Sequence, residues 1–303
     1  MSLLAVGSVA FDDLETPFGR QENILGGSAS YFSLSASRFH PVQVVAVVGE
    51  DFGPQQERVF EGRTIDLRGL VRKPGKSFHW KGSYGYDLSE ATTLDTQLNV
   101  FQDFRPVLPE SYRVAPYLFL GNIDPALQLD VVNQMIQRPR WIALDTMDYW
   151  IRGAREALER VLREVDILLV NEGEARALTG EHNLLKIYRK IQTLGPRILV
   201  VKRGEHGAML LSPEGMFASP AFPLEDVFDP TGAGDTFAGG FLGYLAAKQS
   251  TDVNTLKHAT LTGIIMASFT VEKFGTQCLE IVTEHDIKGR MKAFSDMIRV
   301  NGL

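Results

Sequence analysis

Residues 229–237 read Asp-Pro-Thr-Gly-Ala-Gly-Asp-Thr-Phe, and a helical pattern of apolar residues follows them directly. Gly232 and Gly234 carry no side chains, so backbone N–H groups in this stretch can turn toward a ligand without obstruction. A helix that begins near Gly234 adds the positive end of its dipole, and the two features together predict an anion site. Asp235 then lies in the first helical turn, where a charged base is suited to removing a hydroxyl proton during phosphoryl transfer.

This stretch closely resembles the D-T-x-G-A-G-D-x-F signature of the ribokinase-like (PfkB) family of carbohydrate and nucleoside kinases. The resemblance implies that Asp235 is the catalytic base, because the last Asp of the signature has that role in the family. It also implies that the backbone of Gly232, Ala233 and Gly234 holds the transferring phosphate. A bare G-x-G-D would be explained more simply as a helix start with an acidic first turn, but the length of the match favours the kinase interpretation.

The composition indicates a globular intracellular protein. The 303 residues are 44% hydrophobic, which is enough for one large domain or two modest ones with a substantial core. The net charge of −6 and the lack of long basic runs argue against nucleic-acid binding. The single cysteine, Cys278, excludes an intrachain disulfide and fits a reducing cytosol, so we expect a cytoplasmic location. The first residues do not resemble a signal peptide, and no apolar stretch reaches the ~18 residues of a membrane span.

Short apolar runs bounded by turn residues predict buried strands, and helical patterns alternate with them. The predicted strands are residues 3–6, 42–48, 117–120, 141–144, 167–170 and 198–201. The predicted helices are residues 27–38, 126–137, 151–164, 172–179, 183–194, 234–248, 253–270 and 284–298. This alternation predicts a three-layer α/β fold, with a mostly parallel central sheet and helices on both faces. Ligands in such folds gather at the carboxyl ends of the strands.

Residues 72–104 depart from this alternation. Aromatic residues alternate there with polar ones, which suggests short antiparallel strands with one covered face. These aromatic residues are Phe78, Trp80, Tyr84 and Tyr86. We expect residues 1–303 to form a single ribokinase-like kinase domain, from which a small β-sheet lid projects. Parts of 8–18 and 72–104 would form the lid, and the family resemblance implies the same arrangement.

The acceptor side of the predicted site depends on two segments. Gly26 and Gly27 precede a predicted helix; alone they would be an ordinary turn, but in position they resemble the G-G-rich segment that lines the family's substrate site. Tyr31 stands where the family usually has an Asn that contacts substrate hydroxyls, so that contact is either lost or replaced by a phenol. Asp12 follows the first strand, where a carboxylate can accept two sugar hydroxyls. It matches a family Asp with that role, although Asp12 and Asp13 could also be simple turn residues.

Two further motifs follow predicted strands on the nucleotide side. Residues 171–174 match the family's N-x-x-E motif, which implies that Asn171 and Glu174 help to place Mg²⁺ and phosphates, often through water. A carboxylate suits a hydrated Mg²⁺. Residues 202–207 resemble the nucleotide loop T-x-G-x-x-G, with Gly204 and Gly207 matching and Lys202 in place of Thr. Lys202 could reach a phosphate as a point charge, or be a solvated lysine at a strand end.

Residues 267–277 resemble the helix and loop that border adenine in the family. In some members this loop and the region of Asp229 also bind a monovalent cation. The match after Gly275 is loose, because Cys278 and Leu279 stand where small polar residues often occur. The sequence leaves the monovalent cation open.

The sequence therefore predicts an ATP-dependent kinase that uses Mg²⁺ and phosphorylates a hydroxyl of a nucleoside or sugar. A primary hydroxyl is the expected acceptor group. The aromatic lid, with Phe11 and Tyr31, slightly favours a nucleoside whose base stacks on these rings, although aromatic residues also cover sheets for structural reasons. A simple-sugar kinase of the ribose or fructose type is the alternative. A catalytically weak nucleotide-binding regulatory protein is disfavoured by the intact Asp235. We expect ATP and a small-molecule acceptor as partners, no nucleic acid or membrane, and a monomer or a homodimer through the lid.

Overall fold

The structure is a computed structural model that describes residues 2–299; residues 1 and 300–303 of the expected domain lie outside this range. A nine-stranded sheet forms the centre of the described chain. Its strands are β1 (Leu3–Val6), β4 (Val42–Val48), β5 (Ile65–Arg72), β8 (Tyr117–Leu120), β9 (Trp141–Asp145), β10 (Ile167–Asn171), β11 (Ile198–Lys202), β12 (Ala208–Ser212) and β13 (Gly215–Ser219). Their order across the sheet is β13-β12-β11-β10-β9-β8-β1-β4-β5. In this order, all neighbours from β11 across to β5 pair in parallel. At the other edge, β12 pairs antiparallel with β11, and β13 pairs antiparallel with β12.

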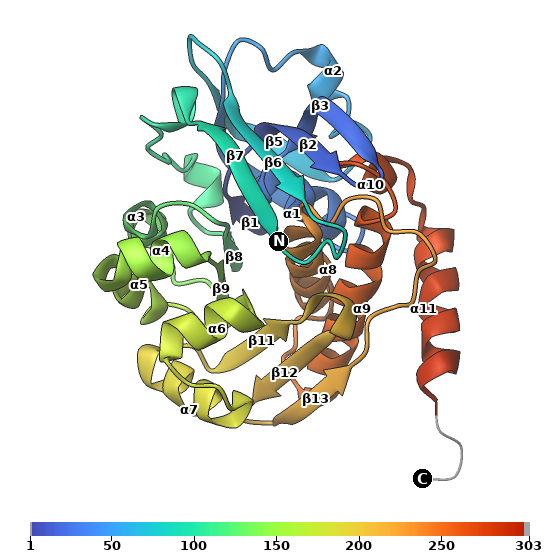
Figure 1. Ribbon diagram of the computed structural model, residues 1–303. Helices are drawn as coiled ribbons and strands as arrows, with labels where there is room; N and C mark the ends of the chain where they lie inside the picture. The colour runs from blue at the N-terminus through green and yellow to red at the C-terminus, as the bar shows by residue number, and fades with distance from the viewer. Residues whose placement is uncertain (1, 300–303) are drawn as a thin grey trace.

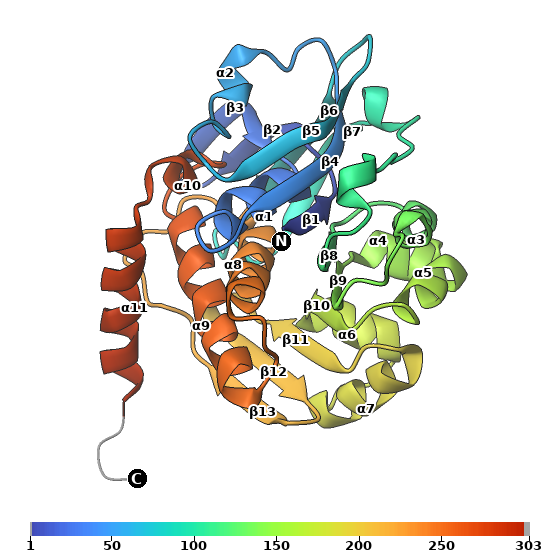
Figure 2. The same ribbon diagram turned by 180° about the vertical axis from the view of Figure 1, so that it is seen from behind.

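Helices cover both faces of this sheet, as Figures 1 and 2 show from opposite sides. One layer contains α1 (Ser28–Ala36), α8 (Ala233–Lys248), α9 (Val253–Thr270), α10 (Gln277–Ile281) and α11 (Glu284–Ile298). The other contains α3 (Pro125–Gln134), α4 (Asp148–Gly153), α5 (Arg155–Leu162), α6 (Glu172–Thr179) and α7 (Leu184–Leu194). Alternate residues of a strand serve the two layers: Leu3 packs into the first and Leu4 into the second, both fully buried. The predicted three-layer α/β fold is confirmed.

A separate four-stranded sheet lies at one end of the molecule, at the top of Figure 1. Its strands are β2 (Ala10–Thr16), β3 (Gly19–Gly26), β6 (Phe78–Tyr84) and β7 (Ala91–Gln97), in the order β3-β2-β6-β7. Within residues 72–104, β6 and β7 pair antiparallel, as the sequence predicted, whereas β2 joins β6 in parallel. Strand β3 was not predicted, because its residues 19–23 are exposed and mostly polar and show no apolar run.

Several elements differ from the sequence prediction. The helix expected over 151–164 is two helices, α4 and α5, because Ala154 leaves the helical region with φ −134° and ψ 36°. Strand β5 was missed, since its residues Ile65–Arg72 are mostly half-buried or exposed at the sheet edge. The hairpin of β12 and β13 and the short helices α2 (Pro54–Glu57) and α10 were also missed.

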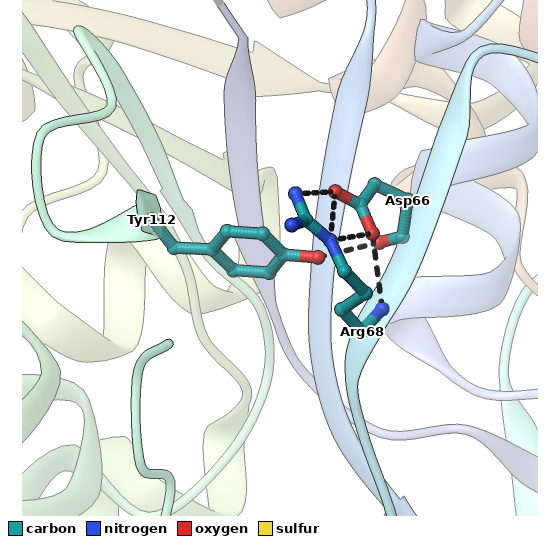
Figure 3. A network of polar contacts seen from close by, with 3 residues as sticks. All are labelled: Asp66, Arg68 and Tyr112. Carbon is teal, nitrogen blue, oxygen red and sulfur yellow. Dashed lines mark hydrogen bonds and ion pairs between the residues drawn. The ribbon is translucent and has the colours of Figure 1, made fainter. Parts of the chain in front are cut away.

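A polar network fastens β5 to the chain that leads into β8 (Figure 3). The Arg68 guanidinium donates from Nε to both carboxylate oxygens of Asp66, at 3.0 and 2.9 Å, and this contact lowers the pKa of Asp66 to about 2. The Tyr112 hydroxyl donates to the Asp66 carbonyl oxygen at 3.1 Å. The neighbouring Gly69 allows close contact, because a Cβ there would lie 2.4 Å from the Val44 carbonyl oxygen. The network therefore secures the edge of the sheet at a place where its register shifts.

None of the helices within residues 2–299 is long and apolar enough to cross a lipid bilayer.

Candidate active site

Three charged or polar residues come together because their strands run parallel, and a fourth approaches from the small sheet. Asp145, Asn171 and Lys202 are the last residues of β9, β10 and β11, which are neighbours in the sheet. Asp12 follows β1 through a short connection and lies in β2. Since the carboxyl ends of parallel strands meet at one edge, residues distant in sequence share one site.

The start of α8 contains the residues of the predicted anion site. Gly232 precedes the helix with a left-handed φ of 72°, and no side chain caps the first turn. The N–H groups of the first turn have no partner within the helix, and the Ala233 N–H donates to the Pro230 carbonyl oxygen at 3.2 Å. Close contacts explain the glycines: a Cβ on Gly232 would lie 2.4 Å from the ring of Tyr31, and one on Gly234 would lie 2.9 Å from Lys202 Nζ. The helix dipole and the open amides favour a negative ligand at this point.

Asp235 lies in the first turn of α8, beside this anion site. Burial raises its pKa to about 7, and the charges of Asp145 and Glu174 act in the same direction while Lys202 opposes them. A carboxylate of this pKa takes up a proton more readily than an ordinary surface aspartate does. It is therefore matched to accept a proton near neutral pH.

Lys202 and Asp145 form a buried ion pair next to Asp235, with Nζ and Oδ2 2.7 Å apart. Asp145 is only 5% exposed, and its other oxygen, Oδ1, accepts the N–H of Thr146 at 2.9 Å. Burial works to lower the pKa of Lys202, but Asp145 and Glu174 outweigh it and the pKa is raised. The ammonium therefore keeps its charge. Asp145 was missed by the sequence analysis, although its position directly after a predicted strand was the same signal that identified Asp12.

Asn171 and Glu174 cap the start of α6 reciprocally. The Asn171 side-chain oxygen accepts the Glu174 N–H at 2.7 Å, and Glu174 Oε2 accepts the Asn171 N–H at 2.8 Å. Burial raises the pKa of Glu174 to about 7. One carboxylate oxygen, Oε1, is left free of the cap. Within the described residues no group of three or more acidic, His or Cys side chains is arranged to hold a metal ion.

The loop after β11 leaves its backbone open on one side. Gly204 and Gly207 both have positive φ, 54° and 86°. A Cβ on Gly207 would lie 2.0 Å from the Ser219 carbonyl oxygen, whereas a Cβ on Gly204 would meet nothing within 4 Å. Gly207 is therefore required for packing, and the backbone at Gly204 is open to a ligand.

Asp12 is buried on the opposite side of the site, with 4% exposure. Burial raises its pKa, and the charges of Asp229 and Asp235 add to the effect. Gly26 lies directly against it, since a Cβ there would be 1.9 Å from Asp12 Oδ2. Gly27, with φ 92°, begins α1 immediately after.

Asp13, the alternative to Asp12, has partners of its own. Its Oδ1 lies 3.1 Å from His79 Nε2 and accepts the Asn23 N–H at 2.9 Å. Asp13 is therefore occupied within the small sheet.

Tyr31 departs from the expectation that it offers an aromatic face to a ligand. The residue is 1% exposed, and its ring packs against Gly232. Its hydroxyl is buried without a hydrogen-bond partner among the residues described. Burial raises the pKa of this phenol, and the charges of Asp12 and Asp229 raise it further. The ring thus supports the glycine loop, and the unpaired hydroxyl is the part that could contact a ligand.

The loop before α8 is held by a buried carboxylate. Asp229 is fully buried and accepts the N–H groups of Thr231 at 2.9 Å and Gly275 at 2.8 Å. Tyr84 of the small sheet hydrogen-bonds Thr231 through the two hydroxyl groups, 3.0 Å apart. The small sheet, the loop before α8 and the loop after α9 are therefore connected at one point.

Comparison with known proteins identifies the family of the chain. The family model described as "pfkB family carbohydrate kinase" matches residues 6–282. The chain is 30% identical to a cytidine kinase of Thermococcus kodakarensis over 80% of this chain and 87% of the relative.

Two solved structures share the fold at low identity. A putative ribokinase II from E. coli, solved with ATP and Mg²⁺, has a TM-score of 0.79 at 17% identity over 96% of this chain and 99% of its own. A nucleoside kinase of Burkholderia thailandensis, solved with inosine, has a TM-score of 0.76 at 18% identity over 97% and 98%. The match of the family model over nearly the whole chain shows that this protein belongs to the pfkB family of carbohydrate kinases, phosphotransferases that act on an alcohol group.

Proposed function

We propose that this kinase transfers the γ-phosphoryl group of ATP to the primary hydroxyl of a nucleoside. The observation that carries the proposal is the start of α8, where Asp235, with a pKa of about 7, lies beside uncapped helix amides and the Lys202 ammonium. A base and an anion site in contact are what phosphoryl transfer to a hydroxyl requires. The cytidine kinase relative and the inosine complex support the choice of a nucleoside.

In this mechanism the Asp235 carboxylate takes the proton of the acceptor hydroxyl. The hydroxyl oxygen of the acceptor attacks the γ-phosphorus at the same time, and ADP leaves. The amides of Gly232, Ala233 and Gly234 stabilise the charge on the transferring phosphoryl group. Lys202 and the loop of Gly204 and Gly207 contact the ATP phosphates.

Mg²⁺, when bound, would neutralise the ATP phosphates. The absence of a cluster of three acidic ligands in the described chain fits a metal held mainly by phosphates and water. Glu174 Oε1 is free of the helix cap and would reach such a hydrated ion. The Asn171 oxygen already caps α6, so its amide NH₂ is left to donate to a phosphate.

The acceptor is proposed to lie between the small sheet, which carries Asp12, and the start of α8. Asp12 of β2 pairs in register with Trp80 of β6, and residues paired across strands share a face. A carboxylate that binds ribose hydroxyls would thus have an indole beside it for a base. Gly26 and Gly27 leave room for the carboxylate, and the Tyr31 hydroxyl would add a hydrogen bond.

A simple-sugar kinase remains the second candidate, because Asp12 would bind the hydroxyls of ribose or fructose equally well. ATP consumption measured with a panel of nucleosides and sugars separates the two. Acceptor-stimulated turnover of any kind contradicts a purely regulatory role.

The small sheet is proposed to act as a lid that excludes water from the transfer site. Its edge strand β7 is exposed from Ala91 to Gln97, so a homodimer through the lid and a monomer are both compatible with the structure. We propose the cytoplasm as the place of action. A monovalent cation beside Asp229 also stays a prediction, since a carboxylate that accepts two N–H groups retains lone pairs for an ion.

The variant Asp235→Asn tests the general base. It should keep its fold and ATP affinity while kcat falls about 10²–10⁴-fold. Asp226→Asn, an exposed acid in the preceding loop, is the matched control and should retain wild-type turnover. A correctly folded Asp235→Asn protein with near wild-type kcat would remove Asp235 from the mechanism.

The pH profile should show the same base. The pKa of Asp235 is raised to about 7, so the carboxyl is protonated and inactive below this pH and becomes active as pH rises through it. We therefore expect kcat to fall about tenfold per pH unit well below pH 7. Glu174 has a similar pKa, so Glu174→Gln is the control: it should raise the Mg²⁺ requirement and keep the acid limb. Loss of the limb in this variant would assign the titration to Glu174 instead.

The variant Asp12→Ala tests the acceptor site. Hydrogen bonds from hydroxyls to a carboxylate are worth about 1.5–3 kcal/mol each, so KM for the acceptor should rise strongly while KM for ATP changes little. Asp13→Ala removes a neighbouring carboxylate whose partners lie within the small sheet and should leave acceptor KM nearly unchanged. Equal effects of both variants on the acceptor would contradict the assignment.

Tyr31 is tested by two replacements. Tyr31→Phe removes only the unpaired hydroxyl and keeps the ring that packs on Gly232, so it should lower kcat/KM for the acceptor without loss of thermal stability. Tyr31→Asn should in addition shift the ratio of kcat/KM values from nucleosides toward simple sugars. An unchanged kcat/KM in Tyr31→Phe would leave the residue a purely structural role.

A further inference from the structure

Asp145 is a buried carboxylate to which the proposed function assigns no role. It ends β9 at the centre of the carboxyl edge of the sheet and is 5% exposed. Burying a charge is costly unless it is paired, so its only charged partner within 4 Å among the described residues, Lys202, is the natural place to look for its purpose.

We propose that Asp145 is a positioning residue that holds the Lys202 ammonium against the N-terminus of α8, where the ammonium stabilises the phosphoryl group during transfer. This inference rests on the proposed function and extends it. It predicts that the pair acts mainly on kcat.

The first support is the rigidity of the carboxylate. Its Oδ2 binds Lys202 Nζ at 2.7 Å, and its Oδ1 accepts the Thr146 N–H at 2.9 Å. Both oxygens therefore have a protein partner, one of them a backbone amide that cannot move far. Lysine has a flexible four-carbon side chain, and holding that side chain in one conformation costs entropy. A carboxylate in a fixed position therefore determines where the ammonium lies.

The second support is the place to which the ammonium is held. A Cβ on Gly234 would lie 2.9 Å from Lys202 Nζ, so the charge lies against the middle residue of the Gly232–Asp235 stretch. The open amides of α8 and the ammonium thus face the same small volume. An ammonium has three N–H donors, so it can keep Asp145 on one and offer others to a phosphoryl oxygen.

The charges around the pair agree with this role. Glu174 and Asp235 act on Lys202 together with Asp145, so three acidic groups surround one cation. A lysine bound only by its carboxylates would be an inert structural charge. Here the missing side chain of Gly234 leaves room for the Lys202 ammonium beside the proposed anion site. A positive charge that is already in position stabilises a phosphoryl transition state.

The main rival is that Asp145 binds Mg²⁺ and touches Lys202 incidentally. A double-mutant cycle separates the two. We propose Asp145→Asn, Lys202→Met and the double variant, assayed with MgATP and the best acceptor of the panel, with ADP affinity and thermal melting as folding controls.

If the proposal holds, Lys202→Met lowers kcat by about 10²–10³-fold, as loss of a preorganised charge contact does. Asp145→Asn should lower kcat by a similar order, with a smaller change in KM for ATP and an unchanged Mg²⁺ titration. The double variant should be no slower than Lys202→Met by more than a few-fold, because Asp145 acts only through Lys202. Lys202→Arg should recover part of the loss.

Multiplicative losses in the double variant, or a raised Mg²⁺ requirement in Asp145→Asn, would overturn the proposal in favour of a metal ligand. Near wild-type kcat in a folded Asp145→Asn protein would also overturn it. Failure of the proposed function is recognised separately, because the wild-type protein would then show no acceptor-stimulated ATP consumption.

Discussion

The site depends on one constraint, the parallel direction of the central strands β11, β10, β9, β8, β1, β4 and β5. It sends the carboxyl ends of β9, β10 and β11 to one edge, so that Asp145, Asn171 and Lys202 become neighbours although about 57 residues separate the first from the last. The start of α8 completes the arrangement from the helical layer. A local sequence motif supplies the base and the amides, and the sheet supplies the surrounding charge.

The site carries a cost in stability. Asp12 and Asp235 have pKa values raised by burial, and the Tyr31 hydroxyl is buried without a partner in the described chain. Unsatisfied buried polar groups destabilise a fold by about 1–3 kcal/mol each. A buried polar atom without a partner also occurs elsewhere in the described chain, for example Gln43 Oε1 in β4, so this cost is not confined to the site. Asp145 and Lys202, by contrast, satisfy each other.

The regular part of the fold was predictable because its signals are local. The six central strands are mostly apolar runs, since both of their faces are buried, and α6, α7 and α11 follow clear helical periodicity. Strands β5 and β13 lie at the two edges of the sheet, where burial is partial and the apolar signal is weak. Strand β12 was missed although its residues 208–211 are apolar and mostly buried. The break at Ala154 follows Gly153, a helix-stop signal that the predicted helix over 151–164 passed over.

The sequence by itself determined the fold class, the anion site at Gly232–Gly234 and the position of Asp235, because each follows from contiguous residues and local backbone geometry. Only the tertiary structure decided that the Tyr31 ring packs against Gly232, and that Asp145 binds Lys202. Both contacts join residues far apart in the chain, and no periodicity or spacing encodes them. Such pairings exist only after the strands have taken their order, since that order determines which buried charges meet.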